Sequence, residues 1–379
     1  MEPITHFLTG ACIGRAGLNR KTVYATLAAV LAAEAADLDI LWGFAGPVEE
    51  LKHHRGITHT IVFAPVVAAA AVGAVALWHW FRMRQYARKA ATDPPPDTRT
   101  WEPGAPERRP PQPVHWGWLY LTALIAALSH ILLDWTNNYG VRPFFPFNPH
   151  WYAGSFVFIA DPVLWALLGS ALLFPWLFGL TDREIGARRQ PFRGRGWAIF
   201  ALSGMVLWWG LRWTEHGQAE DLLRNNPVAN RPVDRLAMEP YPWSPFHWHA
   251  IMETAAYYQT AEVNTWTGEI SSDPQEDVLY KPRDTEAVEA AKKTFLGRVY
   301  LDWGRWAVVS DVGQDPIAGL PPPELPPGRT WTTVEFQDLR FGYRFPGAKH
   351  SSAPPLSGWV YIVDGREDGG EAMGGREQK

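Results

Sequence analysis

The chain has 379 residues, of which 47% are hydrophobic, and a formal net charge of -4 at pH 7. A chain with this net negative charge has no overall positive potential, so nucleic acid is not an expected partner. Cys12 is the single cysteine, which excludes an internal disulfide and a zinc site built from several thiolates.

Long apolar segments are concentrated in residues 1–214. Residues 3–18 are short and mildly apolar, so we expect a half-buried or re-entrant helix there. A bilayer crossing needs about 20 apolar residues. Five segments are expected to cross: 22–41, 57–81, 116–135, 156–180 and 197–213. The sequence therefore predicts an all-α multi-helix transmembrane domain over residues 1–214.

Two Arg-rich loops predict how this domain is oriented across the membrane. Residues 82–113 are also rich in Pro, and residues 181–195 form the second basic stretch. Because cytoplasmic loops carry an excess of Lys and Arg, we expect both loops in the cytoplasm. The polar ends of the segments then meet on the outer side, and the last crossing delivers the rest of the chain to that side.

Residues 215–365 are predicted to form a smaller soluble α+β domain. A polar helix over 215–224 and a Pro-rich linker through Pro245 lead into it. Alternating, aromatic-rich stretches predict strands at 247–253, 257–264, 306–310, 330–336 and 359–363. Asp284 can cap a helix over 284–299. The Gly- and charge-rich residues 366–379 are expected to be disordered.

Histidines and carboxylates stand at the ends of the apolar segments, where ionisable groups are costly and need partners. His130 and Asp134 are four residues apart and share one helical face. His54 and His59 flank a turn at Gly56 that can bring them together. The candidate metal ligands are His6, His54, His59, His130, Asp134 and Asp161.

Simpler interpretations exist for several of these residues. An HxxxD pair alone is more often hydrogen-bonded than metal-bound, and His6 can equally serve packing or capping. Asp161 precedes Pro162, so it is most simply a helix N-cap.

The candidate catalytic residues are Asp37, Asp39 and Arg55. The two carboxylates can ligate a metal, orient a histidine or accept a proton, and Arg55 can clamp an anion. Imidazole and carboxylate ligands without thiolate suit zinc, with manganese or iron as alternatives. The number of candidate ligands would also fit a two-metal site.

Four motifs in order resemble the membrane-bound, metal-dependent hydrolases of the YdjM type. They are Thr5-His6 with Gly10, Asp37-Leu38-Asp39, residues 54–60, and Ser129-His130 followed by Leu133-Asp134 and Thr136. The resemblance covers roughly residues 1–180, and Thr60 stands where members often have Ser. It implies a helical membrane domain with a metal site. It also implies a more distant likeness to zinc-dependent phospholipase C, and no known substrate.

The leading hypothesis is an integral hydrolase of a bacterial inner membrane with an extracytoplasmic C-terminal domain. Metal-activated water would cleave a phosphoester, most naturally that of a lipid-linked substrate, at the outer face of the bilayer. The alternative is a non-catalytic membrane protein in which a metal or polar cluster holds helices together and the outer domain binds a partner; the sequence identifies no protein partner. A transporter is less favoured because the ionisable groups gather at one face and not at the midplane.

Overall fold

The computed structural model describes residues 1–92, 112–184, 194–343 and 354–374. The chain forms two compact units. The first comprises Met1–Asp37, Thr58–Asp134 and Ala160–Trp208, and the second comprises Leu38–Ile57, Trp135–Ile159 and Trp209–Lys379. The second unit therefore includes two segments that the sequence places in the membrane domain. Its last segment begins at Trp209, within a helix that continues past the expected boundary at residue 214.

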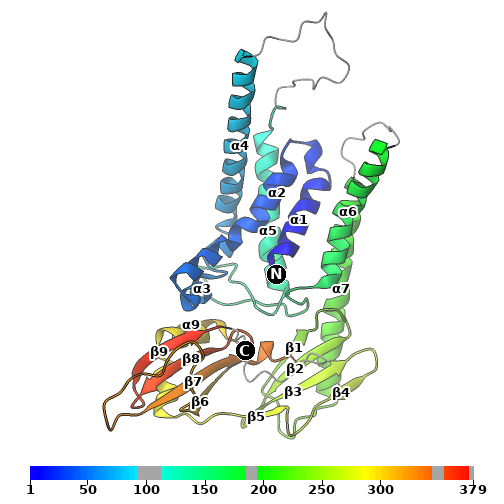
Figure 1. The fold of residues 1–379 in the computed structure, drawn as a ribbon. Coiled ribbons are helices and arrows are strands. Elements are labelled where there is room, and N and C mark those ends of the chain that lie inside the picture. Colours follow the sequence, from blue (N-terminus) through cyan, green and yellow to red (C-terminus); the bar gives the residue numbers. More distant parts are fainter. Residues whose placement is uncertain (93–111, 185–193, 344–353, 375–379) are drawn as a thin grey trace, which may run out of the picture. The chain divides into compact units, whose positions relative to one another are not determined.

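The first unit is helical, as predicted (Figure 1). Its elements are α1 (Pro3–Arg15), η1 (Leu18–Arg20), α2 (Ala25–Glu34), α4 (Ala64–Thr92), α5 (Trp116–Thr136), α6 (Pro162–Glu184) and the first part of α7 (Arg195–Asn225). Two 3-10 segments, η2 (Ala35–Ala45) and η3 (Ile57–His59), cross the divisions between the units.

Three helices in the described part of the chain are long and apolar enough to cross a membrane: Ala64–Ala91, Trp116–Thr136 and Pro162–Thr181. They correspond to three of the five predicted crossings. The crossing predicted over residues 22–41 is not one continuous α-helix, because α2 ends after 10 residues, a rise of about 15 Å, and the chain continues as η2. Glu34 is the last residue of α2, and the acidic residues that follow it, Asp37 and Asp39, lie in η2.

The basic loop predicted over 82–113 is corrected at its start, since α4 continues to Thr92. Arg and Lys are good helix formers, and the Arg84 guanidinium lies 3.8 Å from the centre of the Trp80 ring, which supports this continuation. Residues 93–111 of this loop and 185–193 of the second basic loop lie outside the described residues.

Small residues bring α1 against α2. A Cβ on Gly10 would lie 2.8 Å from the Ala29 carbonyl oxygen, and one on Gly14 would lie 2.5 Å from the Thr26 Cα. Only glycine allows this approach, as is common where membrane helices pack closely. The contact places His6 of α1 and the last turn of α2 near α5, and Figure 1 shows the three helices side by side.

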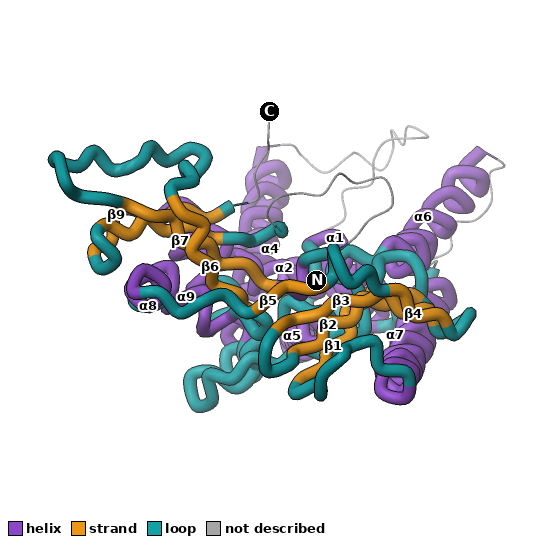
Figure 2. The backbone as a smooth tube through the Cα atoms, turned by 90° about the horizontal axis from the view of Figure 1, so that it is seen from below, coloured by secondary structure: helices purple, strands orange, loops and turns teal. Residues whose placement is uncertain are grey.

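The second unit contains two antiparallel sheets (Figure 2). The first has the order β1-β2-β3-β4 with β5 beside β3, and the second has the order β6-β7-β8-β9. The strands are β1 (Arg235–Pro240), β2 (His247–Glu253), β3 (Tyr257–Asn264), β4 (Glu269–Ser271), β5 (Val278–Tyr280), β6 (Ala307–Gly313), β7 (Trp331–Asp338), β8 (Gly358–Val363) and β9 (Glu367–Met373). The remaining elements are α3 (Pro47–His53), α8 (Glu286–Ala291), α9 (Phe295–Trp303) and η4 (Leu339–Phe341).

Aromatic and β-branched side chains form the core of this unit. Tyr300 and Trp303 of α9 pack with Phe336 and Val360 of the second sheet. A smaller cluster joins Ile251 of the first sheet to Val308 of the second. These buried side chains explain why an α+β arrangement, as predicted, forms here.

Several boundaries differ from the sequence predictions. The helix expected over 284–299 is divided into α8 and α9, because Thr294 accepts a hydrogen bond from Gly297 N and caps a new helix. Strand β1 forms within the predicted Pro-rich linker. The tail expected to be disordered from residue 366 instead forms β9, whose backbone pairs with the fully buried β8. Residues 375–379 of that tail lie outside the described residues.

Candidate metal centre

Helix α5 supplies two candidate ligands from one face. His130 and Asp134 are one turn apart, and His130 Nε2 lies 3.3 Å from Asp134 Oδ2. Both side chains have 0% exposure. The i, i+4 spacing therefore produces the juxtaposition that it predicted.

Two 3-10 segments bring Asp37 and His59 to the same place. Asp37 follows α2 in η2, and His59 is the last residue of η3. His59 Nε2 lies 3.2 Å from Asp37 Oδ1 and 3.4 Å from Asp134 Oδ2, and His130 Nε2 lies 3.5 Å from Asp37 Oδ1. One ligand atom from each of the four residues falls within 4.8 Å of all the others. We refer to Asp37, His59, His130 and Asp134 as the metal centre.

These separations test whether a metal ion fits. A tetrahedral zinc ion with bonds of about 2.05 Å separates its ligand atoms by about 3.3 Å. An octahedral ion with bonds of about 2.1 Å separates neighbouring ligand atoms by about 3.0 Å. The nitrogen to oxygen distances of 3.2, 3.3, 3.4 and 3.5 Å are closer to the tetrahedral spacing. The donor set and its dimensions therefore fit a divalent metal ion.

A backbone carbonyl selects the ligating nitrogen of His130. His130 Nδ1 lies 2.6 Å from the Ala33 carbonyl oxygen. A carbonyl can only accept, so Nδ1 carries the proton and Nε2 presents its lone pair to the centre. His130 Nε2 is buried without a hydrogen-bond partner in the described part of the chain. A buried lone pair in that state is what a metal ligand requires.

His59 is oriented by its chain neighbour. Its Nδ1 lies 3.0 Å from the Thr58 hydroxyl oxygen. His59 Nε2 is the nitrogen that faces Asp37 and Asp134. Asp37 Oδ1 lies 3.2 Å from this nitrogen, and the ionised carboxylate is the form of an aspartate that ligates metals.

His6 lies beside the metal centre. Its ring stacks on that of His130, with centroids 3.7 Å apart and an interplanar angle of 20°. Its Nε2 is 3.5 Å from Asp134 Oδ1, and neither ring nitrogen has a hydrogen-bond partner among the described residues. His6 faces the second oxygen of a centre ligand, so it either extends the ligand set or positions Asp134.

Asp161 caps a helix in this structure. Asp161 Oδ1 accepts hydrogen bonds from the backbone nitrogens of Val163 and Leu164, at 2.9 and 3.2 Å. Trp208 Nε1 donates to Asp161 Oδ2 at 3.0 Å. The N-cap of α6 was the simplest interpretation of Asp161 before Pro162, and these contacts support it over a ligand role.

The remaining predicted site residues belong to the second unit. Asp39 accepts from the Arg55 backbone nitrogen at 2.9 Å and lies 3.0 Å from His54 Nδ1. The Arg55 side chain is 2% exposed, donates to Asn137 Oδ1 and to the Gly140 carbonyl, and lies 4.6 Å from the centre of the Tyr139 ring. These contacts give Arg55 a structural role. The metal centre does not include Asp39, His54 or Arg55.

Sequence reasoning missed one group that orients His130 in the first unit. The Ala33 carbonyl is a backbone acceptor at the end of α2, and no residue type marks such a position. Only the three-dimensional position of α2 beside α5 identifies it.

A family description, YdjM inner membrane protein, matches residues 1–219 of the chain. The matched region contains all four residues of the metal centre. No curated protein and no solved structure matches the chain.

Proposed function

We propose that this chain, which belongs to the YdjM inner membrane protein family, is an integral membrane hydrolase that depends on a divalent metal ion. The observation that carries the proposal is the metal centre itself, in which four ligand atoms lie within 4.8 Å of one another. Ionisable residues buried among membrane helices are costly, and a function usually accounts for them. Zinc fits the spacing best, and manganese and iron are the alternatives.

The four residues differ in exposure, and this difference suggests separate roles. The side chains of His59, His130 and Asp134 are 0% exposed, whereas that of Asp37 is 18% exposed. Catalytic zinc sites keep three protein ligands and leave a further position open. We therefore assign His59, His130 and Asp134 to holding the ion, and Asp37 to the side from which a substrate enters.

A zinc ion held there would act as a Lewis acid toward the scissile group and would lower the pKa of a water molecule. The chain's own contribution is to fix the two imidazoles, through Ala33 and Thr58, and to bury the ligands away from bulk water. Asp37 Oδ1, 3.2 Å from His59 Nε2, is placed to accept the proton of an attacking water. This arrangement is suited to hydrolysis.

The proposed substrate is a phosphoester linked to a membrane lipid. His130 and Asp134 lie in the last two turns of α5, a candidate membrane span. A scissile group at the end of a span lies near the boundary between acyl chains and head groups, where lipid phosphoesters are found. Release of phosphate or of a phosphorylated head group from defined phospholipids, compared with release of fatty acid, distinguishes phosphoester from carboxylester cleavage. Fatty acid as the sole product would contradict the substrate assignment.

The proposed orientation has the metal centre and the C-terminal unit on the extracytoplasmic side. It rests on the Arg-rich loops and requires α7 to cross the membrane through residues 197–213. The structure offers a labelling site in Thr267, which is exposed between β3 and β4. A Thr267→Cys variant should react with a membrane-impermeant maleimide in intact spheroplasts, since Cys12 is buried. Labelling only after lysis would place the domain in the cytoplasm.

One observation favours a second candidate function. Three of the four side chains are fully buried, and a closed four-ligand site is typical of structural zinc. In that case the ion would hold α5, η2 and η3 together in a non-catalytic membrane protein, and the second unit would bind a partner.

The Asp37→Asn variant separates the two functions. If Asp37 is a base beside three ligands, the variant keeps its metal and loses hydrolysis. If all four residues form a closed structural site, the variant loses metal and stability together, and the wild type hydrolyses none of the substrates. Metal content and melting temperature, measured beside activity, decide between these outcomes.

A further inference from the structure

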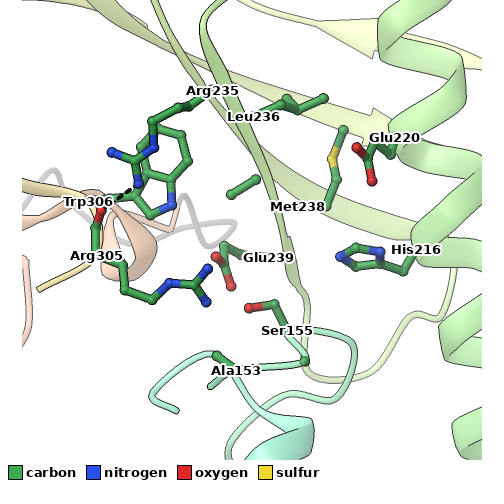
Figure 3. A pocket seen from close by; sticks show the side chains of 12 residues that line it. Ala153, Ser155, His216, Glu220, Arg235, Leu236, Met238, Glu239, Arg305 and Trp306 are labelled. Atoms are coloured by element: carbon green, nitrogen blue, oxygen red, sulfur yellow. Dashed lines mark hydrogen bonds between the residues drawn. The ribbon is translucent and has the colours of Figure 1, made fainter. Parts of the chain in front are cut away.

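A polar cavity lies wholly within the second unit (Figure 3). Its volume is about 300 Å³. Four parts of the chain form its walls: strand β1, the end of α7, residues 153–155, and Arg305 with Trp306. The cavity shares no residue with the metal centre, and most of its lining follows residue 219, where the family match ends.

Glu239 of β1 points into this cavity toward Arg305 and Ser155. Its side chain is buried, at 1% exposure, and its Oε2 has no hydrogen-bond partner in the described part of the chain. A buried carboxyl oxygen without a partner is unfavourable, and a bound ligand that donates to it would remove that cost. Burial raises the pKa of Glu239 to about 8, so near neutral pH the group can donate a hydrogen bond as well as accept one.

Two arginines, Arg235 and Arg305, line the cavity, and their guanidinium groups differ in their contacts. The Arg235 guanidinium pairs with Glu253 at 3.1 Å, donates to the Arg305 carbonyl at 2.9 Å and lies 4.3 Å from the centre of the Trp306 ring. Figure 3 shows the Arg305 guanidinium directed instead toward Glu239 and Ser155. Among the described residues, no hydrogen bond or ion pair engages the Arg305 guanidinium. Arg305 therefore offers its donors to the cavity.

Besides Glu220, which pairs with Arg224, two further polar groups line the cavity. Ser155 has a φ of 52°, a left-handed conformation that is uncommon for residues other than glycine and often accompanies functional sites. It brings the Ser155 hydroxyl to the Glu239 side of the cavity. His216 faces them from α7, and burial lowers its pKa, so its neutral ring can both donate and accept.

We propose that this cavity binds a small polyol phosphate, with the phosphate on Arg305 and hydroxyl groups on Glu239, Ser155 and His216. The planar guanidinium of arginine suits a phosphate or carboxylate, which can take two parallel hydrogen bonds from it. Glu239, Ser155 and His216 each combine donor and acceptor capacity, which matches hydroxyl groups and not a second anion. The volume is at the lower end of ligand pockets, which run from about 300 to 1,000 Å³, so the ligand is small.

The experiment is isothermal titration of the full-length protein in detergent with glycerol 3-phosphate. Inorganic phosphate, glycerol and glycerate are titrated in parallel to separate the contributions of the phosphate, the hydroxyl groups and a carboxylate. We expect glycerol 3-phosphate to bind more tightly than phosphate or glycerol alone. Arg305→Gln should weaken it by about tenfold or more, the loss of one charge-assisted contact. Glu239→Gln, close in size and shape, should weaken it less because the amide still donates and accepts.

Arg298→Gln is the matched control, since Arg298 is an exposed arginine that lines a different cavity of the same unit. It should leave the affinity unchanged. His59→Ala should also leave it unchanged, so that a failure of the metal centre and a failure of this cavity are distinguishable. Tighter binding of glycerate than of glycerol 3-phosphate would keep the cavity but overturn the phosphate assignment. Absence of binding in folded protein, or binding equally strong in Arg305→Gln, would overturn the proposal.

Discussion

His130 Nε2 lies 3.3 Å from Asp134 Oδ2 inside a helix that is apolar enough to cross a membrane. Both side chains are fully buried. An unpaired ionised group at such depth costs several kcal/mol, so the two residues must be compensated by each other and by further partners. Asp37, His59 and the Met1 amino group, which pairs with Asp134 Oδ1, are among those partners, and a divalent ion would neutralise the two carboxylates together.

Asp37→Asn should separate catalysis from metal binding. The amide cannot accept the proton of a water, so turnover should fall by about 10²–10⁴-fold, the usual contribution of a general base. The three buried ligands remain, so metal content should be unchanged. Hydrolysis of phospholipid substrates and elemental analysis on the same preparation check both expectations. Unchanged turnover would remove Asp37 from the mechanism.

Asp161→Ala should act on stability alone. The variant loses two hydrogen bonds at the start of α6 and one from Trp208. An N-cap of this kind is worth about 0.5–2 kcal/mol, so the melting temperature should fall. Metal content should stay at the wild-type value. A loss of metal without a loss of stability would instead make Asp161 a ligand, as one sequence interpretation allowed.

Gly10→Ala should destabilise the first unit. The added methyl would lie 2.8 Å from the Ala29 carbonyl oxygen and 2.9 Å from the Ala33 Cβ, so α1 and α2 must separate. Overpacking of this size costs about 1–3 kcal/mol. Gly73→Ala in α4 is the control, because no atom lies within 4 Å of its new Cβ. Equal melting temperatures for the two variants would show that the α1 and α2 packing is not tight.

Glu239 should make the second unit less stable as pH rises. Burial, with a further contribution from Asp338, raises its pKa from 4.5 to about 8 despite the opposing effects of Arg340, Ser155 and Arg305. Between these values the folded state binds more protons than the unfolded state, so stability falls with increasing pH. Glu239→Gln stays neutral, so its melting temperature should exceed that of the wild type increasingly from pH 5 to pH 8. A constant difference across that range would mean that Glu239 ionises normally.

The sequence predicted that His130 and Asp134 lie together. His130 and Asp134 share a face because α5 is regular, and helical spacing is a property of sequence. Which of Asp37 and Asp39 joins them could not be predicted, since the expected helix over 22–41 ends at Glu34 and continues as η2. His54 was predicted beside His59, but it pairs with Asp39 in the second unit.

In the second unit, too, the sequence predicted elements with a local pattern and missed those that depend on long-range contacts. Strands β2 and β3 were predicted over the residues where they occur, because their side chains alternate and are rich in aromatic residues. Strand β9 is rich in glycine and charge, and its order comes from the ladder with β8, a long-range partner that composition does not reveal. The polar cavity around Glu239 depends on four separate parts of the chain, so no local pattern indicated it.

The most direct test is the metal content of detergent-purified protein, measured by elemental mass spectrometry on the wild type and on His59→Ala and His130→Ala. His79→Ala serves as the control, because His79 lies in α4 beside Tyr24 and Trp116 and outside the metal centre. The account predicts bound zinc, manganese or iron in the wild type and in His79→Ala, and its loss from both centre variants. Folded wild-type protein that binds no divalent metal, or centre variants that retain it fully, would contradict the account.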